Sequence, residues 1–141
     1  MPWRIGIEKP IDSSFVGQHE FQKIVELDNQ SLATSGNYRK FKIINGKKFS
    51  HSINPISGFP ANNKLLSVSV ICKKAAMADA LSTSFMIMGK RNTIMFIKNN
   101  PIDSILCFMV YDSLNKFNAP RPQAKIMRKR WSGIISEGGR I

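Results

Sequence analysis

The sequence is poor in acidic residues, histidine and cysteine. Nine Asp and Glu residues stand against 21 Lys and Arg residues, and the chain holds two histidines and two cysteines. No spacing of Cys and His would hold zinc, and no P-loop, G-x-G-x-x-G or G-x-S-x-G motif is present. These absences argue against a zinc site, the common phosphate-binding loops and a nucleophile-elbow hydrolase.

Long hydrophobic runs are also missing. No stretch reaches the roughly 18 apolar residues that a membrane-spanning helix needs. The opening segment, "MPWRIGIEKP", lacks the basic start and apolar core of a signal peptide. The sequence as written therefore predicts no transmembrane segment and a cytoplasmic location.

The chain has enough apolar residues for one folded domain. It is 141 residues long and 43% hydrophobic, which is typical of a globular protein with a single core. Cys72 and Cys107 both lie in apolar runs. This placement favours buried free thiols, with a disulfide as the alternative.

The net charge of +12 could indicate a nucleic acid or an anionic lipid as partner. The alternative is a composition rich in Lys, Asn and Ile, as AT-rich genomes tend to produce. No helix carries a continuous basic stripe, and aromatic residues are not interleaved with the charges as stacking platforms. We therefore expect no specific nucleic-acid partner, although a small basic nucleic-acid-binding protein stays an alternative.

The first half of the sequence predicts strands. Alternating or continuous apolar runs between turn-forming residues indicate strands at residues 3–7, 21–27, 32–36 and 65–73. Asn45-Gly46 lies between two β-like runs, which is the strongest short signal for a hairpin.

The second half begins with a helical pattern. Residues 75–89 are rich in Ala, Met and Leu, and Gly89 is well placed to end this helix. Residues 91–100 indicate a second helix ended by Pro101, and residues 104–112 a buried strand. From Asn118 onward no steady period is seen, so no regular element is predicted there. The expected fold class is α+β, a mainly antiparallel sheet flanked by helices.

Two features could carry chemistry. Asp79 and Thr83 are four residues apart on the predicted helix, so they share one face and offer the hard oxygen ligands that Mg²⁺ or Ca²⁺ accepts. The alternative is that Asp79 serves the helix dipole and that the spacing is a coincidence. His51 begins the loop "HSINPISGFP", where it is either a site residue or a surface histidine.

Three segments together resemble a known family. They read "TSGNYRKF", "GKKFSHSINPISGFP" and "LLSVSVICKKAAMADALSTSFMIMG". Their order and spacing are similar to the ApbE family of FAD:protein FMN transferases, with its TSG-x-Y-R, SH-x-I-DP-x-TG-x-P and ADA-x-x-T motifs. The resemblance runs from Trp3 to about Gly89, and it implies the C-terminal half of an ApbE-like fold.

The resemblance implies a role for each matching residue. Asp79 and Thr83 fall on the family's Mg²⁺ ligands, and His51 falls on the histidine near the reacting pyrophosphate. The cofactor-binding positions of the TSG-x-Y-R and SH-x-I-DP motifs fall on Thr34, Ser35, Gly36, Ile53 and Asn54.

The resemblance also implies a reaction and its partners. Family members split FAD, attach FMN to a threonine hydroxyl of a target flavoprotein and release AMP, and intact members are typically exported lipoproteins facing the periplasm. The alternative within the same fold is a protein that holds a flavin or Mg²⁺ without catalysis.

The chain departs from the family pattern in sequence and in length. Asn54 replaces the aspartate of the DP pair, and Met77 replaces an acidic residue before the helix aspartate. Members are roughly twice as long, so the resemblance predicts that residues 1–117 are the C-terminal portion of such a domain, with 118–141 as a divergent basic tail. We expect the chain to need the missing N-terminal half of the enzyme and to be inactive alone.

Overall fold

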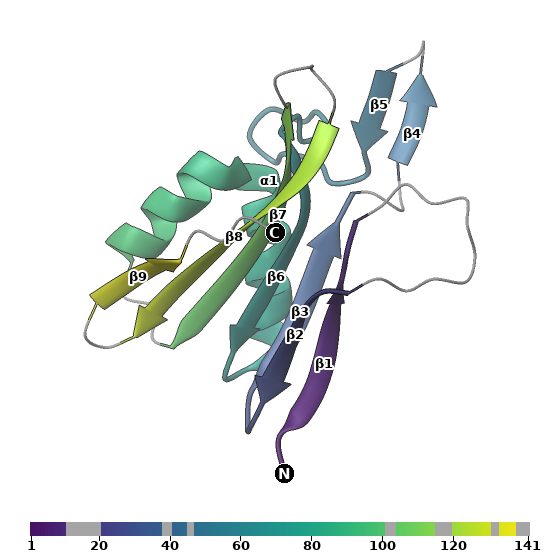
Figure 1. Ribbon diagram of the computed structural model, residues 1–141. Helices are drawn as coiled ribbons and strands as arrows, with labels where there is room; N and C mark the ends of the chain where they lie inside the picture. The colour runs from purple at the N-terminus through teal and green to yellow at the C-terminus, as the bar shows by residue number, and fades with distance from the viewer. Residues whose placement is uncertain are drawn as a thin grey trace.

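The computed structural model describes residues 1–10, 21–37, 41–44, 47–100, 104–114, 120–130 and 133–137. Its main element is a five-stranded sheet in which every neighbouring pair is antiparallel. In spatial order the strands are β3 (Ser31–Gly36), β6 (Leu65–Cys72), β7 (Ile105–Leu114), β8 (Pro120–Arg130) and β9 (Gly133–Glu137). β3 therefore forms one edge of this sheet (Figure 1).

Two hairpins accompany the sheet. In the first, β1 (Trp3–Glu8) pairs with β2 (Phe21–Leu27), and in the second β4 (Phe41–Ile44) pairs with β5 (Lys47–Ser50). Ile44 lies opposite Lys47, so the register leaves the two-residue connection expected for the Asn-Gly hairpin. Asn45 and Gly46 themselves lie outside the described residues.

The single described helix, α1 (Ala75–Asn99), consists of two halves separated by a break at Gly89. Gly89 has φ 78° and ψ 167°, a conformation that is essentially restricted to glycine. The predicted end of the first helix at Gly89 is thus confirmed. The side chain of Asn63 donates to the carbonyl of Met86 at 2.7 Å and Thr93 donates to the carbonyl of Phe85 at 3.3 Å, which satisfies carbonyl groups left open at the break.

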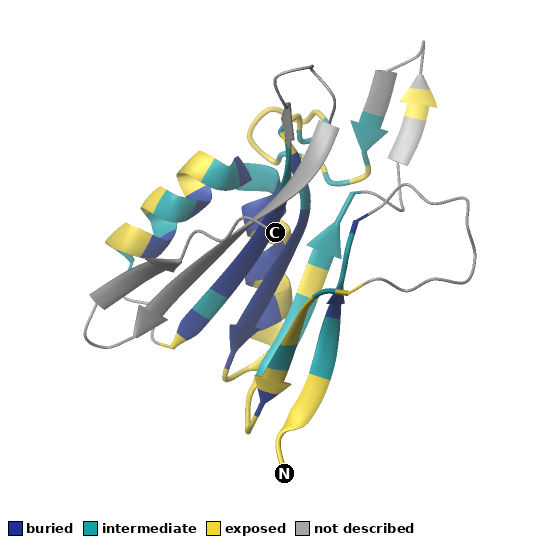
Figure 2. Ribbon diagram, in the orientation of Figure 1, coloured by how far each residue is buried: buried dark blue, intermediate teal, exposed yellow. Residues whose placement is uncertain are grey.

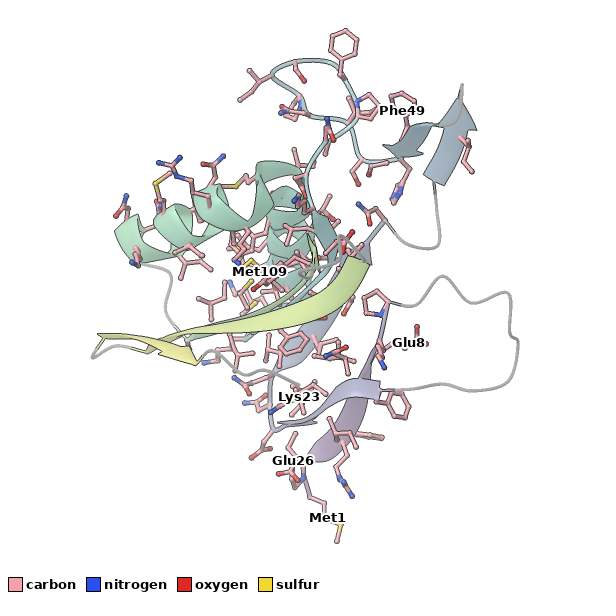
Figure 3. All side chains as sticks on the ribbon, turned by 45° about the horizontal axis from the view of Figure 1, so that its top comes forward. Met1, Glu8, Lys23, Glu26, Phe49 and Met109 are labelled. Carbon is pink, nitrogen blue, oxygen red and sulfur yellow. The ribbon has the colours of Figure 1, made fainter. Side chains whose placement is uncertain are left out.

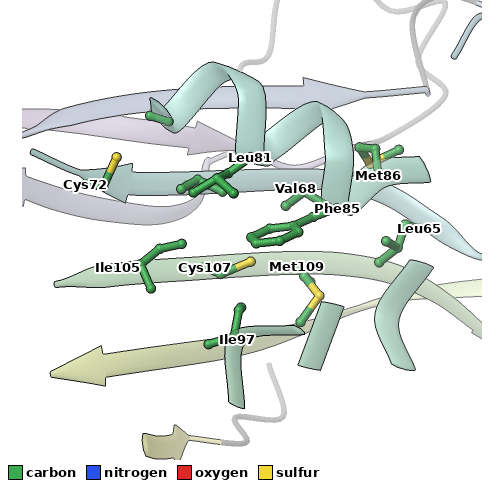
Figure 4. Packing of buried hydrophobic residues seen from close by; sticks show 12 residues of the cluster. Leu65, Val68, Cys72, Leu81, Phe85, Met86, Ile97, Ile105, Cys107 and Met109 are labelled. Carbon is green, nitrogen blue, oxygen red and sulfur yellow. The ribbon is translucent and has the colours of Figure 1, made fainter. Parts of the chain in front are cut away.

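The core lies between α1 and the sheet. Alternation along β7 points Cys107 and Met109 toward α1, where Phe85 is fully buried (Figure 4). Met109 lies between α1 and the sheet in Figure 3. Phe85 also contacts the ring of Phe96 edge-on. The opposite face is covered by the β1–β2 hairpin, where Ile7 packs on residues of β7. Figure 2 shows the buried residues gathered in β6, β7 and the inner face of α1. The α+β class with a mainly antiparallel sheet is confirmed.

One expectation is wrong. The aperiodic sequence from residue 118 predicts no regular element, yet β8 and β9 extend the sheet beyond β7. The physical reason is that β7 offers a long edge, and pairing runs from Ile105 opposite Lys129 to Leu114 opposite Pro120. Hydrogen bonding along this edge acts between backbones and leaves little trace in the side-chain pattern. The division of the chain at residue 118 stays a prediction.

Both cysteines are buried free thiols, as the apolar runs around them favour. Desolvation by burial raises the pKa of the Cys107 thiol from its ordinary 9.0 to about 12. It is therefore protonated and unreactive at neutral pH. Within the described part of the chain, no helix combines the length and apolar character that crossing a membrane requires.

Candidate functional site

A cleft of about 480 Å³ opens at the end of the edge strand β3, where β1, the loop after β5 and the first half of α1 meet. Each element contributes a short run or a single side chain. The lining residues are Gly6, Ile7, Glu8, Thr34, Ser35, Gly36, His51, Ser52, Ser67 and Thr83.

Five residues that the sequence singles out meet in this cleft. Thr34, Ser35 and Gly36 come from the end of β3, His51 from the loop after β5, and Thr83 from α1. These segments are separated in the chain, and the packing of α1 against β3 and β6 brings Thr83 close to the end of β3. The resemblance-based positions therefore converge on one hollow, which no single segment could form.

Hydroxyl groups join β3 to its neighbours beside the cleft. The Oγ atom of Ser35 lies 2.9 Å from Ser82 Oγ and 2.9 Å from Thr83 Oγ1, both on α1. Thr34 Oγ1 lies 2.8 Å from Ser69 Oγ on β6. Because side chains alternate along a strand, Ser35 faces α1 and Thr34 faces the β1–β2 side. The cleft thus wraps around the edge of the sheet.

The loop that follows His51 is held by its own backbone and side chains. The Oδ1 atom of Asn54 accepts a hydrogen bond from the Ile56 amide at 2.9 Å, and its carbonyl accepts one from Gly58 at 2.8 Å. Asn and Asp close such Asx-turns equally well, which explains how Asn54 replaces the expected aspartate without loss of shape. Asn54 and the half-exposed Ile53 do not line the cleft, so their cofactor contacts stay predictions.

Asp79 lies just outside the lining. Asp79 precedes Thr83 by one helical turn, and its side chain is exposed. Its backbone carbonyl accepts a hydrogen bond from Ser82 at 3.0 Å. In the described ranges, no three His, Cys, Asp or Glu side chains gather as a metal cluster. The donor set here is instead one carboxylate with neighbouring hydroxyl oxygens, and hard oxygen ligands of this kind fit Mg²⁺.

The cleft has little positive charge of its own. No Lys or Arg is found among its described lining residues, which include the carboxylate of Glu8. The excess of basic residues in the sequence is therefore not concentrated at this site. A phosphate-bearing ligand here needs a cation, or basic groups from outside these residues, to offset its charge.

Several lining residues are not predicted as site residues by the sequence, namely Gly6, Ile7, Glu8, Ser52 and Ser67. One signal could have indicated Ser67. It alternates with Ser69 in an otherwise apolar strand, and polar residues at every second position mark one face of a buried strand. Ser67 is 2% exposed, and its Oγ atom has no hydrogen-bond partner among the described residues.

Known proteins are similar to this chain both in sequence and in fold. The ApbE family model matches residues 1–106. The FAD:protein FMN transferase of Vibrio cholerae is 36% identical over 117 residues, which cover 83% of this chain and 34% of the relative. That of Escherichia coli K12 is 31% identical over 121 residues, covering 86% and 33%.

Solved structures agree with these relatives. The flavin transferase ApbE of Vibrio cholerae superposes with a TM-score of 0.64 at 32% identity, over 87% of this chain and 35% of that one. The apo flavinyl transferase ApbE of Pseudomonas stutzeri gives 0.60 at 30% identity, over 97% and 34%. The chain thus spans about a third of the length of the curated relatives it matches. With the three motifs meeting in one cleft and the family model matching across them, this chain belongs to the ApbE family.

Proposed function

We propose that this chain forms part of an FAD:protein FMN transferase site. The observation that carries the proposal is the meeting of Thr34, Ser35, Gly36, His51 and Thr83 in one cleft. In the proposed reaction, the hydroxyl oxygen of an acceptor threonine on a target flavoprotein attacks the phosphorus of the FMN half of FAD. The bond to the bridging pyrophosphate oxygen breaks, and AMP leaves with that oxygen.

The cation in this proposal is Mg²⁺, held by the carboxylate of Asp79 and the hydroxyl of Thr83. Bound there, it would offset the negative charge that develops on the pyrophosphate oxygens. The absence of Lys and Arg from the described lining supports this assignment, because the charge must be compensated in another way. Two protein ligands leave most of the octahedral positions of Mg²⁺ to water, substrate or further groups.

His51 has two chemical possibilities in the cleft. Its imidazole can take the proton that the acceptor hydroxyl loses, or it can donate a hydrogen bond to a phosphate oxygen. The end of β3 supplies hydroxyl groups and a glycine without a side chain, which suits close approach of a ligand to the backbone. These groups bind and orient the dinucleotide, and positioning is a large part of catalysis in phosphoryl transfer.

The remainder of the site is proposed to come from residues that correspond to the other two thirds of the relatives. The described lining supplies no Lys or Arg to bind a pyrophosphate, and we expect the chain alone to bind FAD and Mg²⁺ weakly and to transfer no FMN.

The test is to incubate the full chain with FAD, Mg²⁺ and a target flavoprotein domain, with and without a separately produced N-terminal portion of a relative. Mass spectrometry then reports FMN on the acceptor threonine, and the matched control is the same domain with that threonine changed to valine. Labelling only with both portions supports the proposal. Labelling by the chain alone would contradict the proposal that the chain is incomplete. If no FMN is attached and the flavin absorbance does not change in any mixture, the proposed function is wrong.

A further inference from the structure

A continuous set of hydroxyl groups links the two residues proposed to hold the cation. Ser35 Oγ on β3 lies 2.9 Å from both Ser82 Oγ and Thr83 Oγ1 on α1. Ser82 Oγ in turn lies 3.0 Å from the backbone carbonyl of Asp79. The path therefore runs from Thr83 through Ser35 and Ser82 to the backbone carbonyl of Asp79, one helical turn before Thr83.

The direction of each hydrogen bond follows from counting protons. A carbonyl oxygen can only accept, so the single hydroxyl proton of Ser82 points to Asp79. The oxygen of Ser82 must then accept the proton of Ser35. With that proton used, the oxygen of Ser35 can only accept, so Thr83 donates to it. The order is Thr83 to Ser35 to Ser82 to the carbonyl.

This order has a consequence for the cleft. Thr83 lines it, and the hydroxyl proton of Thr83 is engaged by Ser35, which leaves the lone pairs of the Thr83 oxygen for another partner. We infer that Ser35 and Ser82 are positioning residues that hold the Thr83 hydroxyl as an acceptor for a hard cation in the cleft. The inference rests on the proposed function for the identity of that cation.

Burial of Ser82 stabilises this donor-to-acceptor order of the hydroxyl groups. Ser82 is 0% exposed, so water does not compete for its proton or its oxygen. Reversing the path would leave the Asp79 carbonyl without the Ser82 donor and would free the proton of Thr83 to point into the cleft. A proton in that position opposes a cation, because a metal binds to oxygen lone pairs.

A purely structural role is the competing explanation, since the same contacts also tie α1 to β3. The two roles differ in what they predict for the hydrogen positions. Neutron diffraction of the full chain, crystallised from deuterated buffer, would locate the deuterons on the three hydroxyl groups. A deuteron between Thr83 and Ser35 that is bonded to Thr83 is the expected result. A deuteron on Ser35 pointing at Thr83 would overturn the inference, whatever the chain does with metal.

Cation binding gives a second readout, and Mn²⁺ is the probe because its paramagnetism broadens nearby NMR signals even when binding is weak. In the parent chain, titration with Mn²⁺ should broaden the amide signal of Thr83. Ser35→Ala and Ser82→Ala should each weaken this binding about 3- to 10-fold, the range that one lost hydrogen bond produces. Ser35→Thr keeps the hydroxyl on a strand that tolerates threonine, and it should restore parental affinity.

Ser84→Ala is the matched control, because Ser84 also bonds a carbonyl of α1, that of Ala80, but lies outside the path. It should leave the Mn²⁺ affinity unchanged. Parental affinity in both Ser35→Ala and Ser82→Ala, with folding verified by circular dichroism, would contradict the positioning role. Absence of broadening at Thr83 in the parent would instead contradict the proposed cation site itself, while the deuteron positions still decide the order of the hydroxyl groups.

Discussion

The two halves of α1 differ in their roles: both contribute buried residues, but only the first half also borders the cleft. Residues 75–88 bury Ala78, Leu81 and Phe85 in the core cluster. Residues 90–99 bury Ile97 in the same cluster and Thr93, which donates to the carbonyl of Phe85. Only the first half also presents polar groups to the cleft and beside it. One stretch of helix therefore serves both the core and the candidate site, on different faces, while its continuation serves the core.

The break at Gly89 separates these tasks. It lets the second half take its own direction over the sheet, and Asn63 ties the end of the first half to the segment that leads into β6. Stability and site chemistry can therefore be changed separately in this helix. Substitutions on the inner face should affect folding, and those on the cleft face should affect the proposed activity.

The largest effect is expected from Phe85→Ala. Phe85 is 0% exposed and contacts Phe96 of the second half, so removing its ring leaves a cavity where the two halves meet. The free energy of unfolding should fall by about 3–5 kcal/mol, measured by urea denaturation. Phe59→Ala is the control, because Phe59 is 72% exposed and should change stability by less than about 0.5 kcal/mol. Equal losses would show that Phe85 is not a core residue.

Next comes the cleft face of the first half. In an assembled enzyme carrying this chain, Asp79→Ala should lower FMN transfer by roughly 100-fold or more, because it removes a charged ligand of the cation. Thr83→Val should cost roughly tenfold, since water can replace a neutral hydroxyl ligand. Both side chains are exposed, so thermal unfolding should barely change. Transfer by Asp79→Ala at the parental rate under limiting Mg²⁺ would rule out the assignment.

The break between the halves gives a smaller effect. Gly89→Ala should lower the free energy of unfolding by roughly 1–3 kcal/mol, because the backbone there has φ 78°. The cost comes from the backbone rather than from a clash, since an added Cβ would lie 3.5 Å from the side chain of Asn63. Arg91→Ala, an exposed helical substitution two residues away, should stay within about 0.5 kcal/mol. If both variants unfold at the same urea concentration, Gly89 is not required for the break.

The smallest effect concerns alkaline pH. The buried Cys107 thiol keeps its proton up to about pH 12, whereas in the unfolded chain it loses the proton near its ordinary pKa of 9.0. The unfolded state then binds fewer protons, so this contribution to stability is complete below pH 9 and declines as the pH rises toward 12. Cys107→Ala removes the dependence. The stability difference between parent and variant should therefore shrink from about pH 8 to about pH 10.5 in urea titrations; a constant difference would contradict the raised pKa.

The elements that the sequence predicted are those whose side chains carry a local pattern. The run from Leu65 to Cys72 is almost wholly apolar and becomes the central strand β6, and the Ala- and Met-rich run before Gly89 becomes the first half of α1. The strands β8 and β9 have no such pattern. They form because β7 presents an edge to pair with, and that condition lies elsewhere in the chain.

The site shows the same division. Motif resemblance selected Thr34, Ser35, Gly36, His51 and Thr83, which do share a cleft, and it also selected Ile53 and Asn54, whose contacts with a ligand stay untested. It could not select Ser82, which occupies an unspecified position of its motif, or Ser67, which looks like part of a buried strand. Their importance depends on which strand or helix lies opposite.

The sequence by itself therefore determined the family, the α+β class, most of the strands, the break at Gly89 and the residue types available for chemistry, because each of these is written in local spacing. Only the tertiary structure decided that β3 is an edge strand beside α1, and that Ser35 reaches Ser82 and Thr83. The physical reason is that hydrogen bonds and clefts depend on distances between residues far apart in the chain. Those distances are set by strand pairing and core packing, which act over the whole molecule.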